Sequence, residues 1–528
     1  MMSRRQGHDS HIAAAQHCSD RPKLIWKVHP PAVSRNHRCL LLALGFAMTC
    51  TWAMPARSEW LIAESAHFRV HADMPEAAIR QRTILLEDYR NLLILMTKGP
   101  TSEALEPKLD VFIVKDMAQV FPFSRAPSGV AGLYSANAGG IAAYADTSEL
   151  GQAALQHEYT HHFMRANRSA AYPAWFSEGF AEYFMTATFK SEAIEYGRFR
   201  EGRATWLASN EWLPLEAMLK RDIYGRGGER VMMFYAQSWL MTHYFLGAPG
   251  QAPKLRAYLT AVAAGEDPEK AFAIHVTPDF SGFQSSLKAY LRSKDFVAVT
   301  LKRPPASPAP VTVRPAPPGA STFQLLLNRM MMATDVSSEA RGVAVRRAIA
   351  RDADSPLSAR ARALLALQNK DPEAISLLDR MLAAEPQDPE LLLWRGMAAL
   401  TSTTQNRLEA RRYLTRAFKA NPDDWRVMRM YALASGLRDA PLNENDFGVI
   451  RRAYELAPQV SEVTIDYATA LVHRDDLNTA AKLLSTLANN PHDNKSALLA
   501  ASLREAAIVG DKQKYLSIVR SYYMKNAL

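Results

Sequence analysis

The sequence predicts an α+β domain that is followed by an all-α array of helical repeats. Two observations support this order. Segments of strand-like alternation and of helical spacing are mixed in residues 58–300, whereas only helical periodicity continues after residue 320. The chain has 528 residues, and domains hold roughly 100 to 200 residues each, so two or three units are expected.

The composition is that of a soluble globular protein. Hydrophobic residues make up 48% of the chain and charged residues 22%, which excludes a largely disordered or fibrous protein. The net charge is +10, but residues 1–56 hold seven Lys and Arg against Asp9 and Asp20 and so contribute +5 of it. The remaining charge is spread along the chain without a dense basic run. We therefore expect no nucleic-acid partner.

Residues 1–56 are expected to be an N-terminal extension and a signal peptide. An apolar run at 40–53 follows Arg35 and Arg38, and Ala53 and Ala56 are small residues suited to cleavage. This pattern predicts an exported protein, periplasmic or secreted, with no stable membrane span after cleavage. The alternative is an uncleaved membrane anchor, although the run is shorter than the roughly 20 residues that a span needs.

The three cysteines all precede the expected mature N-terminus. They are Cys18, Cys39 and Cys50. The mature protein would then contain no disulfide bond and no thiolate that could bind a metal.

The first domain is expected to begin with mixed structure and to continue with helices. The alternation at 67–72 and 109–114 predicts strands, and the spacing at 76–96 predicts a helix. Residues 132–144 predict two short strands with a tight turn between them. From 150 to about 291 the pattern becomes helical.

A proline-rich stretch at 301–320 marks the expected domain boundary. Closely spaced prolines are incompatible with a helix interior or a central strand, and they favour an extended, semi-rigid spacer. The sequence therefore predicts a linker between domains at 58–300 and 321–528.

Prolines in the second domain recur at a nearly constant interval. Pro386, Pro422, Pro458 and Pro491 are separated by 36, 36 and 33 residues. Eight residues before each proline stands an apolar residue: Leu378, Leu414, Ile450 or Leu483. This arrangement resembles the second helix of tetratricopeptide repeats, and an irregular helical bundle is the alternative. Stacked repeats would form a concave surface suited to a protein or peptide partner.

A metal-binding motif lies in a helical segment of the first domain. His157, Glu158 and His161 form an HExxH sequence, and the four-residue spacing places both imidazoles on one face of a helix. Two imidazoles suit zinc, which needs a third protein ligand and an open position for water if the site is catalytic. Glu158 could then accept a proton from that water. HExxH alone occurs by chance in on the order of one in a hundred chains of this size. The residues around the motif must therefore decide whether it is a metal site.

A second motif follows the HExxH sequence. Glu178 stands seventeen residues after His161, within the segment WFSEGFAEYF. This segment resembles the second active-site helix of gluzincins, the thermolysin and aminopeptidase-N-like zinc metallopeptidases of the peptidase MA type. The resemblance implies a zincin-like domain in which Glu178 is the third ligand of one zinc ion. It also implies that Glu182 orients a ligand histidine. The two carboxylates could alternatively exchange these roles, and Ser177 departs from the family's Asn.

Two further features are assigned through the same resemblance. Tyr235 corresponds to the tyrosine that donates a hydrogen bond to the oxyanion in aminopeptidase-like members, although it could merely pack. The segment Gly139, Gly140, Ile141 and Ala142 precedes the metal helix where these folds place a sheet edge that pairs with the substrate backbone.

The sequence therefore predicts an exported zinc metallopeptidase acting on peptides or proteins. We expect it to cut internal bonds. Aminopeptidases of this superfamily carry a GxMEN segment whose Glu binds the substrate amine, and here that place falls on Ala142 or Ala143. Two alternatives remain open. One is a non-catalytic envelope scaffold or assembly protein that retains a peptidase-like domain, and the other is a metal-dependent hydrolase of non-peptide amides.

Overall fold

The computed structural model describes nine stretches of the chain, which are 60–97, 107–166, 172–220, 228–293, 296–303, 310–333, 336–400, 404–488 and 494–525. The predicted extension and signal peptide at 1–56, with the three cysteines, lie outside these stretches. Ala56–Leu528 form one compact unit. Within the described stretches, no helix combines the length and the apolar character that a membrane span requires.

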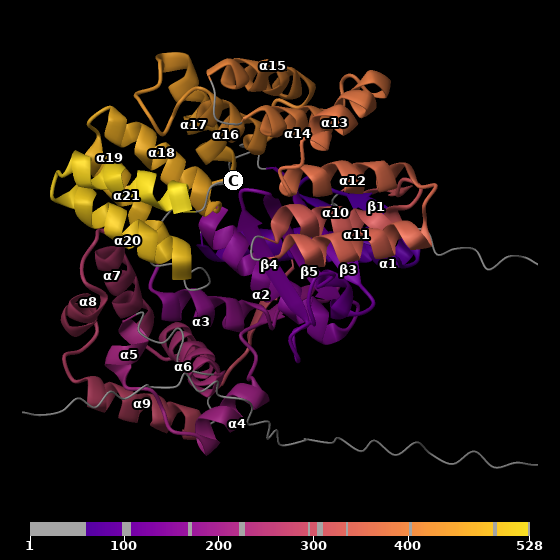
Figure 1. The fold of residues 1–528 in the computed structure, drawn as a ribbon. Coiled ribbons are helices and arrows are strands. Elements are labelled where there is room, and N and C mark those ends of the chain that lie inside the picture. The colour runs from indigo at the N-terminus through magenta and orange to yellow at the C-terminus, as the bar shows by residue number, and fades with distance from the viewer. Residues whose placement is uncertain are drawn as a thin grey trace, which may run out of the picture. The chain divides into compact units, whose positions relative to one another are not determined.

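A six-stranded mixed sheet organises the first domain (Figure 1). Its strands in spatial order are β4 (Gly132–Asn137), β5 (Gly140–Asp146), β3 (Leu109–Val114), β2 (Phe68–Ala72), β1 (Leu61–Glu64) and β9 (Thr312–Pro315). Strands β2, β3 and β5 are parallel, whereas β1 and β4 are antiparallel to their neighbours. The expected strands and the expected turn between β4 and β5 are confirmed.

The inner strand β3 packs against a core on each face of the sheet, since successive side chains of a strand point to opposite sides. On β3, Leu109, Val111 and Ile113 join the core that contains residues of helices α1 (Glu76–Thr97) and α2 (Glu149–Ala166). Phe112 and Val114 join a smaller core on the other face, which contains residues of helices η1 (Met117–Val120) and α10 (Ala320–Met332).

The remainder of the first domain is mainly helical, as expected. Its helices are α3 (Ala174–Phe184), α4 (Glu201–Ser209), α5 (Leu215–Leu219), α6 (Gly228–Gly247), α7 (Gln251–Ala263), α8 (Pro268–His275) and α9 (Phe280–Ser293). The periodicity did not predict the small second sheet, which is formed by β6 (Thr188–Phe189), β7 (Ala193–Tyr196) and β8 (Val299–Lys302). These strands are too short to show a clear alternation in the sequence.

The proline-rich stretch at 301–320 differs from the expected spacer at both of its described ends. Strand β8 reaches Lys302, and β9 pairs with β1 at the edge of the large sheet. Proline is tolerated in an edge strand, because a missing N–H there costs no ladder hydrogen bond. Arg303 also forms an ion pair with Asp88 of α1 at 2.5 Å. The stretch is therefore attached to the first domain on both sides of 304–309, which lie outside the described residues.

The second domain consists of helices that repeat in pairs, orange to yellow in Figure 1. After α10 follow α11 (Ser338–Arg351), α12 (Pro356–Gln368), α13 (Glu373–Ala384), α14 (Pro389–Ala399), α15 (Thr404–Ala420), α16 (Trp425–Ala434), α17 (Glu444–Leu456), α18 (Ser461–His473), α19 (Leu477–Ala488), α20 (Asn494–Ile508) and α21 (Lys512–Lys525). Pro386, Pro422 and Pro458 follow the ends of α13, α15 and α17, and Pro491 lies outside the described residues. The expected helical repeats are thus confirmed.

The predicted apolar positions explain how the paired helices pack. Leu378, Leu414 and Ile450 are fully buried. Gly396 of α14 lies so close to Leu414 of α15 that an added Cβ would be 2.8 Å from the leucine Cγ. In the last of these repeats Leu484 is buried, and the predicted Leu483 is only partly buried.

Candidate metal centre

Two helices bring three potential metal ligands together. His157 and His161 lie one turn apart on α2, and Glu178 lies on α3. The Nε2 atoms of the two histidines are 3.1 Å apart, and the Glu178 Oε2 is 3.5 Å from each of them. The structure thus places the three residues named by the sequence around one point.

The spacing of these atoms suits a tetrahedral zinc ion. Zinc bonds of about 2.0 to 2.1 Å place neighbouring tetrahedral ligand atoms roughly 3.3 to 3.4 Å apart. The three observed separations lie close to that value. Glu178 is also completely buried, at 0% exposure, and burial of a carboxylate is costly unless a cation compensates it. The donor set therefore fits zinc in both geometry and charge.

Burial and the surrounding carboxylates act on the pKa of His157 in opposite directions. Burial lowers its pKa, but the hydrogen bond with Glu178 and the charges of Glu182, Glu158 and Glu178 together outweigh burial, and the net pKa is above the ordinary value. A metal ion and a proton compete for the same imidazole nitrogen. The negative charges that favour protonation of His157 therefore also favour a cation at this point.

Glu182 lies one turn after Glu178 on α3 and is nearly completely buried. Its Oε1 is 3.8 Å from His157 Nδ1, which is longer than a hydrogen bond. Two arginines hold the carboxylate: Arg203 Nη2 is 2.6 Å from Oε1, and Arg200 Nη1 is 3.1 Å from Oε2. Burial raises the pKa of Glu182, but the charges of these arginines and of His157 keep it below the ordinary value.

Arg200 and Arg203 are site residues that sequence reasoning missed. Their three-residue spacing at the start of α4 predicts that they share one side of the chain, and nothing more. Contact with Glu182, 21 residues earlier for Arg203, depends on how α4 folds back against α3.

The two residues assigned to catalysis lie beside the ligands. Glu158 follows His157 on α2, and its charge contributes to the raised pKa of His157. Tyr235 of α6 places its ring centroid 6.3 Å from that of His157. The Arg203 guanidinium carbon is 5.4 Å from the Tyr235 ring centroid. Tyr235 therefore contacts the same cluster as the ligands and the arginines.

His162 and His243, to which the sequence assigned no role, have structural partners. His162 Nδ1 lies 3.1 Å from the Tyr134 hydroxyl of β4. Burial, helped by the charges of Arg165 and Arg90, lowers the pKa of His162 to about 3. His243 lies 2.9 Å from the Tyr290 hydroxyl and 3.0 Å from the Gly197 carbonyl oxygen.

The expected substrate-pairing segment requires a correction. Gly140, Ile141 and Ala142 belong to β5, which is an inner strand of the sheet. All three residues pair with β4, and Ala142 also pairs with Asp110 of β3. Gly139 packs against α10, where an added Cβ would lie 2.0 Å from the Met331 carbonyl oxygen. The edge strand next to the metal helix is β4. The sequence pattern located both strands but could not indicate which would become the edge.

Comparisons with known proteins add little to this picture. No family model and no curated protein matches the sequence. Among solved structures, the chain is similar to one described as "Functional Characterization of Pseudomonas Aeruginosa pilF", at 18% identity and a TM-score of 0.29. The match covers 39% of this chain and 90% of that chain. A likeness at this level supports no statement about function.

Proposed function

We propose that the chain is an exported zinc metallopeptidase of the gluzincin type, with a zincin-like domain followed by tetratricopeptide-type repeats. The convergence of His157, His161 and Glu178 carries the proposal, because their ligand atoms all lie within 4.8 Å of one another in a buried setting. A helix that only filled a core would have no physical reason to bury Glu178 beside two imidazoles.

The residues around the centre have distinct tasks in peptide-bond hydrolysis. A bound zinc ion would polarise the scissile carbonyl and lower the pKa of water. The Glu158 carboxylate accepts the proton of the attacking water and passes it to the leaving amine. The Tyr235 hydroxyl donates a hydrogen bond to the oxyanion that develops on the carbonyl oxygen. Glu182, held by Arg203 and Arg200, places its negative charge beside His157.

The edge strand β4 suggests how a substrate is held. Its outer side has backbone N–H and C=O groups that an extended peptide could pair with. The strand sequence, GLYSAN, includes no carboxylate that would neutralise a substrate's terminal amine. Asp146, the nearest alternative in the sequence, accepts a hydrogen bond from the Ser148 N–H at 2.8 Å, where α2 begins. We therefore propose internal cleavage of peptides or proteins.

Substitution of the general base tests this function. Glu158→Gln removes the proton acceptor and leaves all three ligands, so the variant should retain zinc and lose hydrolysis of a peptide library. Glu149→Gln, at the exposed start of the same helix, is the matched control and should remain active. If the zinc-loaded wild type itself cleaves no peptide, the scaffold alternative is favoured.

Export is a separate part of the proposal and has its own test. Cleavage of the signal peptide should leave an N-terminus near Ala53 or Ala56. N-terminal sequencing of the protein recovered from the envelope or the medium measures this directly. Retention of residues 40–53 would instead indicate a membrane anchor.

A further inference from the structure

Two buried polar residues of α2 stand directly before the two proposed ligand histidines. Gln156 precedes His157, and Thr160 precedes His161. Gln156 is 5% exposed, and Thr160 is completely buried. Burial of a polar side chain is costly unless the side chain is hydrogen-bonded, so the partners of these two residues indicate what they do in the fold.

Gln156 joins α2 to the end of the other ligand-bearing helix. Its Nε2 donates a hydrogen bond to the Ala187 carbonyl oxygen at 3.1 Å. Ala187 follows α3, and its own N–H donates to the Phe184 carbonyl oxygen of that helix at 2.9 Å. Gln156 therefore connects the helix that carries the two histidines to the helix that carries Glu178.

Thr160 joins α2 to α1. The Thr160 hydroxyl donates a hydrogen bond to the Gln156 carbonyl oxygen at 2.8 Å, and its Oγ1 lies 2.7 Å from the hydroxyl oxygen of Tyr89. A hydroxyl has a single hydrogen and a carbonyl oxygen can only accept, so Tyr89 is the donor to Thr160. Tyr89 is completely buried as well. Three hydrogen bonds thus link α1, α2 and the end of α3 in series.

The geometry of the metal centre depends on how these helices are placed. The two histidines and Glu178 come from separate helices, and a ligand site must be held within about 0.5 Å of its productive geometry. The 3.5 Å separations between Glu178 Oε2 and both histidine Nε2 atoms therefore depend on contacts that fix α2 relative to α3.

We propose that Gln156 and Tyr89 are positioning residues, which hold α2 between α1 and the end of α3 and so fix the ligand histidines relative to Glu178. Both act through other groups, Gln156 through the Ala187 carbonyl and Tyr89 through Thr160. The consequence for zinc rests on the proposed metal centre, whereas the fixing of α2 does not depend on it.

Zinc affinity, measured by competition with a chelator, tests this positioning. Gln156→Leu keeps a side chain of similar size but leaves the buried Ala187 carbonyl oxygen without its donor, and Tyr89→Phe removes only the hydroxyl. Each variant retains all three proposed ligands. We expect the zinc affinity to fall about 10-fold in each variant, which is the effect of one lost buried hydrogen bond.

Two matched controls lose buried hydrogen bonds that do not connect the ligand helices. Gln237→Leu on α6 breaks the hydrogen bonds of Gln237 with the N–H and the carbonyl oxygen of Leu213, at 2.7 and 3.0 Å. Thr83→Val on α1 removes a hydroxyl that donates to the Ile79 carbonyl oxygen of the same helix at 2.8 Å. Both variants should lower the free energy of unfolding, as the test variants do, but bind zinc like the wild type.

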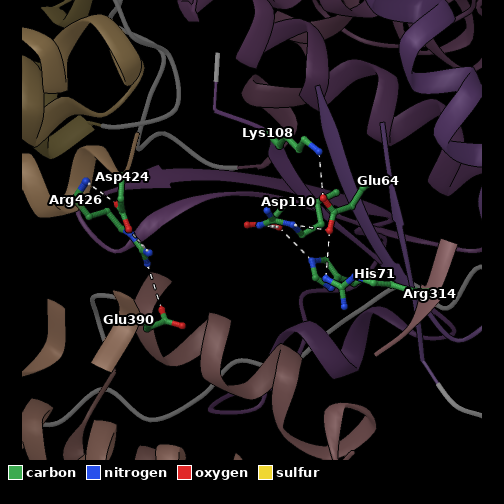
Figure 2. Close-up of polar contacts among 9 residues, drawn as sticks. Glu64, His71, Lys108, Asp110, Arg314, Glu390, Asp424 and Arg426 are labelled. Atoms are coloured by element: carbon green, nitrogen blue, oxygen red, sulfur yellow. Dashed lines mark hydrogen bonds and ion pairs between the residues drawn. The ribbon is translucent and has the colours of Figure 1, made fainter. Parts of the chain in front are cut away.

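A third control lies on the opposite face of the large sheet (Figure 2). His71 Nε2 lies 3.1 Å from Asp110 Oδ1, and Arg69 Nη1 lies 3.4 Å from the same atom. These side chains alternate along β2 and β3 with Val70 and Val111, which join the core that contains residues of α1 and α2. Asp110→Asn removes a charge from this cluster on the other face and should also bind zinc like the wild type.

Amide hydrogen exchange of the metal-free protein measures the fixing of α2 itself. Exchange over α2 should rise about 10-fold in Gln156→Leu and Tyr89→Phe and stay unchanged in Asp110→Asn. If the wild type binds zinc, an unchanged affinity in both test variants, or an equal loss of affinity in the three controls, would overturn the proposal. If the wild type binds no zinc, the proposed metal centre fails, and unchanged exchange over α2 in both test variants would overturn the positioning.

Discussion

Arg203 forms a two-point ion pair with Glu182, in which Nη2 lies 2.6 Å from Oε1 and Nε lies 3.1 Å from Oε2. Glu182 Oε1 in turn lies 3.8 Å from His157 Nδ1. The arginine therefore fixes the orientation of a carboxylate beside His157, one of the proposed metal ligands.

Replacement of Arg203 should weaken zinc binding without removing a ligand. Loss of such an outer partner typically costs 10- to 100-fold in metal affinity, and we expect a loss of about that size in Arg203→Ala. Arg203→Lys keeps the charge but not the two-point geometry and should be intermediate. Competition with a zinc chelator measures the affinity. Arg198→Ala, at a more exposed arginine, is the control and should bind zinc like the wild type. If Arg203→Ala also bound zinc with the affinity of the wild type, Arg203 would have no role in metal binding.

Gly179 allows α3 to approach α6 closely. An added Cβ would lie 2.2 Å from both the Ser238 carbonyl oxygen and the Thr242 Oγ1. Gly179→Ala should therefore lower the free energy of unfolding by at least the ~1 to 3 kcal/mol typical of overpacking. Gly202→Ala on α4, where an added Cβ meets nothing within 4 Å, should raise it by up to ~1 kcal/mol. Urea unfolding of both variants measures the difference, and equal stability would show that α3 and α6 can separate without cost.

Tyr235→Phe tests the oxyanion assignment. A hydrogen bond made only in the transition state should lower kcat by about 10²-fold when removed, with little change in KM. Steady-state kinetics on one peptide substrate gives both constants. An unchanged kcat would return Tyr235 to a packing role beside His157 and Arg203.

The preference for internal bonds can be measured on one quenched peptide with a free or an acetylated amino terminus. A charged amine bound without a carboxylate partner would be desolvated at a cost, so both forms should be cleaved at the same internal position. A strong preference for the free amine, with residues released singly from that end, would show that the protein trims chain ends and would contradict internal cleavage.

Local patterns predicted much of this fold, whereas long-range pairing decided the rest. The helix at Glu76–Thr97 and the strand at Leu109–Val114 follow from periodicity, and the prolines after α13, α15 and α17 mark the repeats. The order of strands in the sheet does not follow from such patterns. Strand β9 pairs with β1 from about 250 residues away, and β5 lies inside the sheet because β4 folds back outside it.

Local patterns predict some residues of the candidate site, and tertiary contacts determine the others. The four-residue spacing in α2 predicts that His157 and His161 share one face, and the motif in α3 indicated Glu178. Arg203 could not be predicted, because it reaches the site through a contact between separate elements. Its importance depends on tertiary structure and leaves no periodic signal in the sequence.

Zinc content of the purified protein and of two glutamate variants tests the central claim most directly. We expect one zinc ion per chain in the wild type, loss of the metal in Glu178→Ala, and retained but weaker binding in Glu182→Ala. This order follows from the position of the Glu178 Oε2 at 3.5 Å from both histidine Nε2 atoms, whereas Glu182 is held by arginines. Full metal occupancy in Glu178→Ala, together with loss in Glu182→Ala, would contradict the assigned ligand set.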